Sequence, residues 1–260
     1  IESTTFSSLQ PGSSSANSTY VTYSGNIGTS PYIIKCHWSG SEGGIADLNG
    51  NAEQFLDDTA ITGGSGPDTS PHAVHVAMAD ASVLFSRSPN APVTGVRVGV
   101  IAFEWVKEKG SAASLTNVTD QTIRQAIAGN ARLALFTGNP SDLSHVYVTG
   151  RNNDSGTRVN GLGVPRFGIF TIPNQLQVNS DGSMVNQGTV GSPIYLGDYG
   201  YSGGGGVAAQ MGYDLSQASS KDVAPLGDGT SHFSVFGYLG NGDAAAAISA
   251  GGTALSYNGI

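Results

Sequence analysis

Short β-forming runs alternate along the chain with segments that carry helix signals, and this alternation constrains the fold more than any other feature. The run His145–Thr149 precedes a polar turn, and Ser234–Leu239 precedes the Ala-rich stretch Asp243–Ser249. Further β-forming runs are Tyr20–Tyr23, Tyr32–Trp38, His75–Ala79, Val96–Phe103 and Thr253–Tyr257. Strands that alternate with helices predict an α/β chain.

The clearest helix signal lies near the middle of the chain. Thr119 or Asp120 can cap a helix there, and Gly129 can end it. The side chains expected on its buried face are Ile123, Ala126 and Ile127. Further on, the four glycines Gly203–Gly206 predict backbone that is either flexible or closely packed.

The composition excludes several classes of protein. Apolar residues make up 38% of the 260 and aromatic residues 8%, which rules out a wholly disordered chain. No apolar run reaches the ~18 residues that a membrane span needs. Charged residues are 12%, about half of the usual ~25%, and a surface built from Ser, Thr, Asn and Gly is typical of secreted proteins. The chain opens without Met, a basic segment or an apolar segment, which indicates either that a leader was removed or that the chain begins at an engineered start. We expect a periplasmic or extracellular location.

The charge balance bears on the partners of the protein. Eleven Lys and Arg against nineteen Asp and Glu give a formal charge of -8, which argues against nucleic acid as the main partner. Ten of the eleven cations lie at or before Arg166, and only Lys221 follows. An anion site must therefore draw its cation from the first two thirds of the chain. The single cysteine, Cys36, excludes an intrachain disulfide and a Cys-based zinc cluster. His72 and His75 are interpreted as structural residues rather than as a metal pair.

The strongest local feature is the polar turn Arg151–Arg158, directly after the predicted strand His145–Thr149. Its Ser155-Gly156-Thr157 segment offers two hydroxyls and free backbone N–H groups at the start of a predicted helix, where the helix dipole adds partial positive charge. Arg151 can supply a planar fork to a tetrahedral oxyanion. The alternative is a polar helix cap beside a solvated arginine.

Two further turns are candidates for the same site. Gly40-Ser41-Glu42-Gly43-Gly44 is also glycine-rich and also lies between a predicted strand and a predicted helix. Its alternative is a plain loop. Asp80 directly follows the predicted strand His75–Ala79. The alternative to a ligand-binding role is that Asp80 caps the following turn through Ser82.

These three turns occur together, in this order, in the phosphate-binding proteins of bacterial ABC importers. The sequence resembles that family at Gly40–Gly44, at Ala79–Ala81, and at Arg151 with Ser155–Thr157. It resembles even more a branch of secreted phosphate-binding-like domain proteins, through Gly150–Arg158. The resemblance implies the type 2 periplasmic-binding-protein fold, with two α/β lobes joined by crossover strands and a ligand cleft between the lobes.

The resemblance also implies a set of ligand-binding residues, which are Ser41, Asp80, Arg151, Ser155, Gly156, Thr157 and Thr5. The Ser and Thr side chains donate hydroxyls, the glycine donates a backbone N–H, and the arginine carries the compensating cation. Asp80 accepts the proton of hydrogenphosphate, whereas a fully ionised sulfate would face that carboxylate with no proton between them. Thr5 stands where the family's first strand presents a Thr or Ser before Phe.

The same resemblance implies a division into lobes. Residues 1–95 would form the first lobe, with 245–260 returning to it, and residues 96–244 would form the second. Compared with the family, the first lobe lacks a closing C-terminal helix and strand. Residues 1–31 are therefore expected either to fold back over their own lobe or to add a strand to an adjacent subunit.

Two functions follow from these observations. The first is an extracytoplasmic solute-binding protein for phosphate or a related oxyanion, with no catalysis, cofactor or metal, and with an ABC importer as its partner. The alternative is a structural subunit of an extracellular filament or surface assembly, which the low charge and the 38 glycines favour. A hydrolase is not expected, because no Ser-His-Asp spacing or carboxylate pair stands out.

Overall fold

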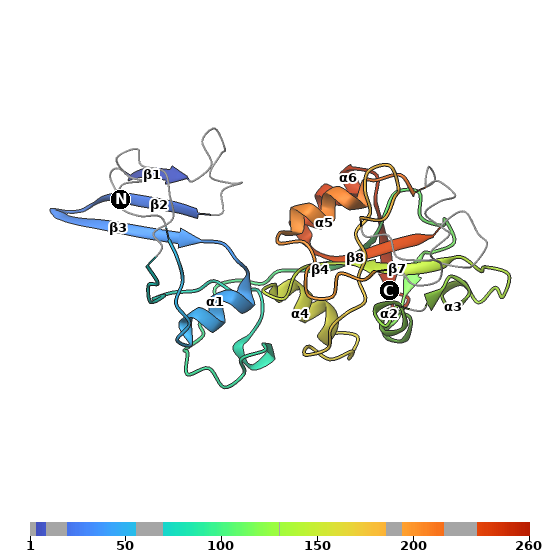
Figure 1. Cartoon of the computed structure of the whole chain (residues 1–260), viewed down its shortest axis with the longest axis horizontal. Coiled ribbons are helices and arrows are strands. Elements are labelled where there is room, and N and C mark those ends of the chain that lie inside the picture. Colours follow the sequence, from blue (N-terminus) through green and yellow to red (C-terminus); the bar gives the residue numbers. More distant parts are fainter. Residues whose placement is uncertain (1–3, 9–19, 56–69, 130, 186–193, 216–232) are drawn as a thin grey trace. The chain divides into compact units, whose positions relative to one another are not determined.

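The computed structural model describes residues 4–8, 20–55, 70–129, 131–185, 194–215 and 233–260 (Figure 1). Its contacts divide the chain into two units, which we describe separately. The first comprises Ile1–Ala79 and Asn90–Thr94, and the second comprises Asp80–Pro89 and Gly95–Ile260. Both strands and helices are present, so the predicted α/β class is confirmed.

The first unit contains a three-stranded antiparallel sheet in the order β1-β2-β3, followed by one helix. Its elements are β1 (Thr4–Ser8), β2 (Tyr20–Ile27), β3 (Ser30–His37) and α1 (Ser41–Leu48). The strands predicted at Tyr20–Tyr23 and Tyr32–Trp38 are thus confirmed. β2 pairs with β3 along its whole length. Strand addition by residues 1–31 to an adjacent subunit stays a prediction.

The strand predicted at His75–Ala79 was wrong. The structure forms no strand there, and Val76 and Met78 are 77% and 73% exposed. An apolar run becomes a strand only where a neighbouring strand completes its ladder and covers its side chains. No strand among the described residues does so here.

The second unit is built on a six-stranded sheet in the order β5-β9-β4-β8-β7-β6. Neighbouring strands are parallel for β5–β9 and β7–β8, and antiparallel for the other pairs. The strands are β4 (Phe103–Lys107), β5 (Asn117–Val118), β6 (Ala131–Arg132), β7 (His145–Thr149), β8 (Ser234–Gly240) and β9 (Thr253–Tyr257). The strands predicted from His145, Ser234 and Thr253 are confirmed.

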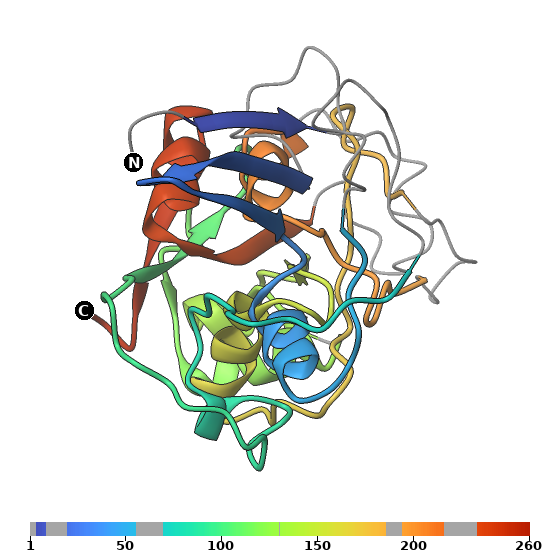
Figure 2. The same cartoon turned by 90° about the vertical axis from the view of Figure 1, so that its left-hand side faces the viewer.

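Helices cover both faces of this sheet. In Figures 1 and 2, α5 and α6 lie side by side on one face, and in Figure 1 α2 and α4 lie on the other. The helices are α2 (Asp120–Ile127), α3 (Ala134–Thr137), α4 (Gly156–Gly163), α5 (Gly204–Met211) and α6 (Asn241–Ser249), with a short 3-10 turn at Val83–Phe85. Successive strand residues point to opposite faces. Trp105 accordingly packs with Ile123 and Leu162 under α2 and α4, whereas Val106 packs with Met211 under α5.

Helix α2 follows the sequence prediction closely. Thr119 is its N-cap, and its hydroxyl accepts the backbone N–H of Thr122 at 3.2 Å. The side chain of Thr122 accepts the Thr119 N–H in return at 2.8 Å. The three side chains predicted to be buried are buried, namely Ile123, Ala126 and Ile127. Gly129 follows with a φ of 83°, which glycine adopts without strain.

The longest predicted strand was wrong over most of its length. Only Phe103 of Val96–Phe103 belongs to a strand, and Val96, Val98 and Val100 are 76 to 88% exposed. The reason lies in the neighbouring strand. The ladder between β4 and β8 ends at the pair Phe103–Gly240, so the residues before Phe103 have no strand beside them among the described residues.

The C-terminal segment also differs from the expected lobe boundaries. Residues 245–260 lie in the second unit, where β9 pairs with β4 through Trp105–Leu255 and with β5 through Asn117–Ser256. The Gly203–Gly206 stretch begins helix α5, and the sequence did not predict that helix. Of the two predictions for the backbone of Gly203–Gly206, close packing is confirmed at Gly206, where a Cβ would lie 2.5 Å from the Tyr201 ring.

Candidate functional site

The candidate site lies where the buried strand β7 ends and α4 begins. All five residues of β7 are buried, and the chain then turns through Gly150 and Arg151 to the helix that starts at Gly156. Arg151 forms a β-bridge with Tyr201. Gly200 makes this approach possible, because a Cβ there would lie 2.6 Å from the Arg151 carbonyl oxygen. The end of a parallel strand beside a helix N-terminus is a common position for ligand sites in α/β proteins.

The Arg151 side chain is held by two backbone carbonyls. Its Nε donates to the Tyr201 oxygen at 3.2 Å and its Nη2 to the Ser202 oxygen at 2.7 Å. Burial lowers the pKa of the guanidinium, while the carboxylates of Asp243 and Asp80 raise it. These two hydrogen bonds fix the orientation of the Arg151 guanidinium beyond the C-terminal end of β7.

Asp80 and Thr157 lie together, as the resemblance implies. The Thr157 hydroxyl donates to Oδ2 of Asp80 at 3.0 Å, and the Asn160 side chain donates to the Asp80 backbone oxygen at 3.3 Å. Both donors belong to α4. The segment that carries Asp80 is therefore attached to the first turns of that helix.

Ser155 is the N-cap of α4. Its hydroxyl accepts the backbone N–H of Arg158 at 3.2 Å, and the residue is 1% exposed. This is the capping role that the alternative interpretation of the turn gave to it. Gly156, the first residue of the helix, is also buried. Contact of Ser155 or Gly156 with a ligand stays a prediction.

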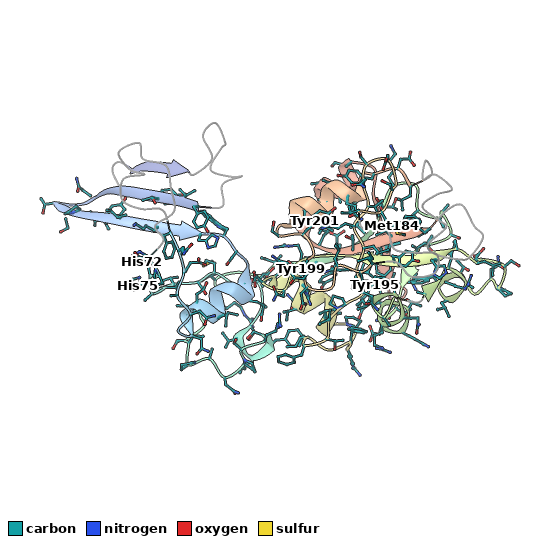
Figure 3. All side chains as sticks on the ribbon, viewed as in Figure 1. His72, His75, Met184, Tyr195, Tyr199 and Tyr201 are labelled. Atoms are coloured by element: carbon teal, nitrogen blue, oxygen red, sulfur yellow. The ribbon has the colours of Figure 1, made fainter. Side chains whose placement is uncertain are left out.

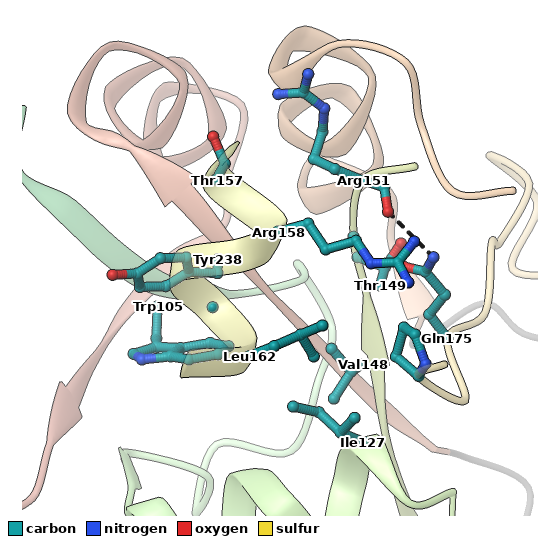
Figure 4. Close-up of a pocket in the computed structure, with 13 residues that line it drawn as sticks. Trp105, Ile127, Val148, Thr149, Arg151, Thr157, Arg158, Leu162, Gln175 and Tyr238 are labelled. Atoms are coloured by element: carbon teal, nitrogen blue, oxygen red, sulfur yellow. Dashed lines mark hydrogen bonds between the residues drawn. The ribbon is translucent and has the colours of Figure 1, made fainter. Parts of the chain in front are cut away.

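The side chain of Arg158, the second arginine of the turn, forms an ion pair within the second unit. Arg158 pairs with the carboxylate of Asp198, and its side chain is only 8% exposed. In Figure 4 it extends away from α4 toward Gln175, whose amide donates to the Arg151 backbone oxygen at 3.2 Å. The cavity there has a volume of about 40 Å³, close to that of one water molecule. It is too small for a tetrahedral anion, so Arg158 supports the site without facing a ligand pocket.

A larger pocket of about 630 Å³ opens on the other side of Arg151 and Thr157. In Figure 4 these two side chains extend away from the small cavity. The pocket is lined by Asp80, Arg151, Thr157, Val100–Phe103 and Gly240–Asp243. All of them belong to the second unit.

Sequence reasoning missed the part of this pocket that comes from the start of α6. Asn241, Gly242 and Asp243 follow the strand β8 directly and form the first turn of the helix. The missed signal was the turn Gly240–Asp243 itself, which has a glycine-rich strand-to-helix sequence like that of Gly40–Gly44. Val100–Ala102 were assigned to a strand and so were not considered as a pocket wall.

Two of the predicted site residues belong to the first unit, so the pocket in the second unit is formed without them. Ser41 is the first residue of α1 and is 8% exposed. Thr5 lies within β1 opposite Ser24, whereas the resemblance expected it at a turn after a strand. Lys221, the only cation after Arg166, lies outside the described residues.

No group of three or more His, Cys, Asp or Glu side chains among the described residues could hold a metal ion. Figure 3 labels His72 and His75, which belong to the first unit. His72 forms a β-bridge with Glu53, and the His37 ring lies 2.7 Å from the Glu53 carboxylate. Of the helices in the described ranges, none combines the length and the apolar composition that crossing a membrane requires.

Comparisons with protein-family models, with curated proteins and with solved structures find no match to this chain. The geometry of the site and the resemblance of its turns are therefore the basis for a functional assignment.

Proposed function

We propose that the second unit binds a small tetrahedral oxyanion, with phosphate as the expected ligand, in the pocket formed by Asp80, Arg151 and Thr157. The observation that carries this proposal is that Asp80 lines the same pocket as Arg151 and Thr157, although it lies about 70 residues before their turn in the sequence. No catalytic step is included in the proposal.

The chemistry of these groups suits a protonated oxyanion. Arg151 supplies the cation, and the N-terminus of α4 adds partial positive charge and backbone N–H groups. Asp80 accepts the single proton of the Thr157 hydroxyl, and its carboxylate has further acceptor positions, so it favours a ligand with a proton to donate. Hydrogenphosphate has such a proton and sulfate does not.

We further propose that the chain is a two-lobed, extracytoplasmic solute-binding protein of the type 2 periplasmic-binding-protein fold. The turns Gly40–Gly44, Ala79–Ala81 and Arg151–Thr157 support this through their resemblance to phosphate-binding proteins of ABC importers. The low content of charged residues supports a secreted location, and an importer would be the partner.

The Arg151→Ala substitution tests the binding proposal. Loss of a charge-assisted contact in a partly desolvated site should weaken phosphate binding by roughly 2–5 kcal/mol, measured by isothermal titration calorimetry. Arg132→Ala is a matched control, because Arg132 lies on β6 and donates to the Leu143 oxygen instead. Circular dichroism verifies that both variants fold. Equal phosphate affinity in the wild type and Arg151→Ala would refute the site.

A second candidate function is a structural subunit of an extracellular filament. The observation that favours it is the exposure of strand-forming apolar residues, such as Ile33 and Ile34 on β3 at 50% each and Val100 at 88%. Strands of this kind are templates for pairing with another chain, and a head-to-tail pairing would give open polymers.

Deletion of residues 1–24 tests this second function, because it removes β1 and half of β2. Particle size is measured by light scattering after size exclusion. The function requires a parent that polymerises and a deletion variant that does not. A monomeric parent, or a variant that polymerises as well as the parent, would exclude strand exchange by this segment.

A further inference from the structure

The pocket contains a second carboxylate that the sequence did not bring into the site. Asp243 is the third residue of α6, one helical turn from the N-cap Gly240, and it lines the same pocket as Asp80 and Arg151. It is half-buried. Its charge acts on the Arg151 guanidinium even more strongly than that of Asp80 does.

The position of the Asp243 carboxylate is fixed by the packing of α6 against α5. Gly204 is the first residue of α5, and a Cβ on it would overlap the Asp243 side chain. The carboxylate therefore lies against the N-terminus of α5, where the helix dipole favours negative charge. Asp243 is held in place from outside its own helix.

The charges around the pocket are one cation, Arg151, and two anions, Asp80 and Asp243. Helix α5 carries no ionisable side chain between Gly204 and Met211. On β4, the Lys107 ammonium donates to the Ala112 oxygen and is not among the groups that line the pocket. Each helix N-terminus adds about half a positive charge, so the N-termini of α4, α5 and α6 together bring the site to within about half a charge of neutral. A dianion would make it strongly negative, whereas a monoanion would not.

An ionised carboxylate has about four acceptor positions, so Asp80 can accept an O–H of the ligand beside the Thr157 hydroxyl, and Asp243 can accept another. Sulfate has no proton to donate, hydrogenphosphate has one, and dihydrogen phosphate has two. We infer that Asp243 and Asp80 each accept one O–H of the ligand, and that the site selects the singly charged, doubly protonated form of phosphate. This inference rests on the proposed oxyanion-binding function and names the ligand form of that site.

Methylphosphonate tests the number of accepted protons at constant charge. Its monoanion has the size and charge of dihydrogen phosphate but one O–H where phosphate has two. We expect calorimetry near pH 5 to give a phosphate affinity about ten- to a hundredfold higher than that of methylphosphonate, the effect of one hydrogen bond to a charged group. Equal affinities would overturn the inference, and leave the oxyanion-binding function intact.

The Asp243→Asn variant assigns the effect to this residue. In the wild type, phosphate affinity should fall about tenfold per pH unit above the second ionisation of phosphate, because the doubly protonated form becomes rarer. In Asp243→Asn the amide can donate to an ionised oxygen, so this fall and the preference over methylphosphonate should both be lost. Asp142→Asn, in an exposed turn where the carboxylate accepts from Thr137 and Asn139, is the control and should behave as the wild type.

The outcomes separate this inference from the proposed function. Phosphate binding with an unchanged pH profile in Asp243→Asn would mean that Asp243 only stabilises the starts of α5 and α6, and would overturn the inference alone. Absence of phosphate binding by the wild type at every pH would overturn the proposed function as well. Where Asp243→Asn fails to fold, the methylphosphonate comparison on the wild-type protein still decides the question.

Discussion

Glu108 is a buried carboxyl group that should make the stability of the second unit depend on pH. It follows β4 directly and is 1% exposed. Its backbone is held by two bonds, from its own N–H to the Val235 oxygen at 2.9 Å and from the Ser111 N–H to its own oxygen at 3.0 Å. Burial is the largest influence on the side chain, and it raises the pKa of the Glu108 carboxyl to about 9.

The direction of the effect follows from the proton balance. The carboxyl is protonated in the folded state up to about pH 9 but loses its proton near its usual value of 4.5 in the unfolded chain. Between these values the unfolded state binds fewer protons, so the free energy of unfolding falls by about 1.4 kcal/mol per pH unit. The stabilisation present below pH 4.5 is thus reduced by about 3 kcal/mol at pH 7 and is lost by about pH 9.

The Glu108→Gln substitution keeps the shape of the side chain and removes its titration. We expect urea denaturation to show a flatter pH dependence than in the wild type, and a free energy of unfolding higher by about 3 kcal/mol at pH 7. Glu104→Gln, on the partly buried start of β4, is the matched control. Identical slopes for Glu108→Gln and the wild type would refute the reasoning.

Two further substitutions test the site and the fold. Asp80→Asn should weaken the selectivity for phosphate over sulfate more than it weakens oxyanion binding as a whole, because the amide can donate to an ionised oxygen. Competition titrations measure this selectivity. If the variant rejects sulfate as strongly as the wild type does, Asp80 is a structural residue. Thr119→Ala should lower the free energy of unfolding by about 1 kcal/mol, since the cap of α2 loses its bond to the Thr122 N–H, and an unchanged urea midpoint would contradict this.

Helix α2 and the start of α4 could be predicted from sequence because their signals are local. The Thr119 cap and the buried Ile123 and Ile127 lie within nine residues, and the Ser155 cap lies six residues after the end of the buried strand β7. Segments whose structure depends on a distant neighbour were not predictable in this way. Val96–Ala102 alternates like a strand, but β8 ends at Gly240 and leaves it without a partner.

The same distinction applies to the candidate site. Arg151 and Thr157 are six residues apart, and their turn was evident in the sequence. Asp80 joined them only through the resemblance, since nothing local indicates that its carboxylate lies 3.0 Å from Thr157. Asp243 was missed because its position depends on the packing of α6 against Gly204, 39 residues earlier in the chain.

The chain passes between its two units three times, at 79/80, at 89/90 and at 94/95. Neither unit is therefore encoded by one uninterrupted stretch of gene. A fragment that starts at Gly95 would carry the whole six-stranded sheet, with Arg151, Thr157 and Asp243, but would lack Asp80. A recombination point at Gly95 would thus transfer this sheet without one of the two carboxylates of the pocket, whereas a point before Asp80 would transfer both. A fragment that carries the complete lining of the pocket must therefore begin at or before Asp80 and include residues 90–94 of the first unit.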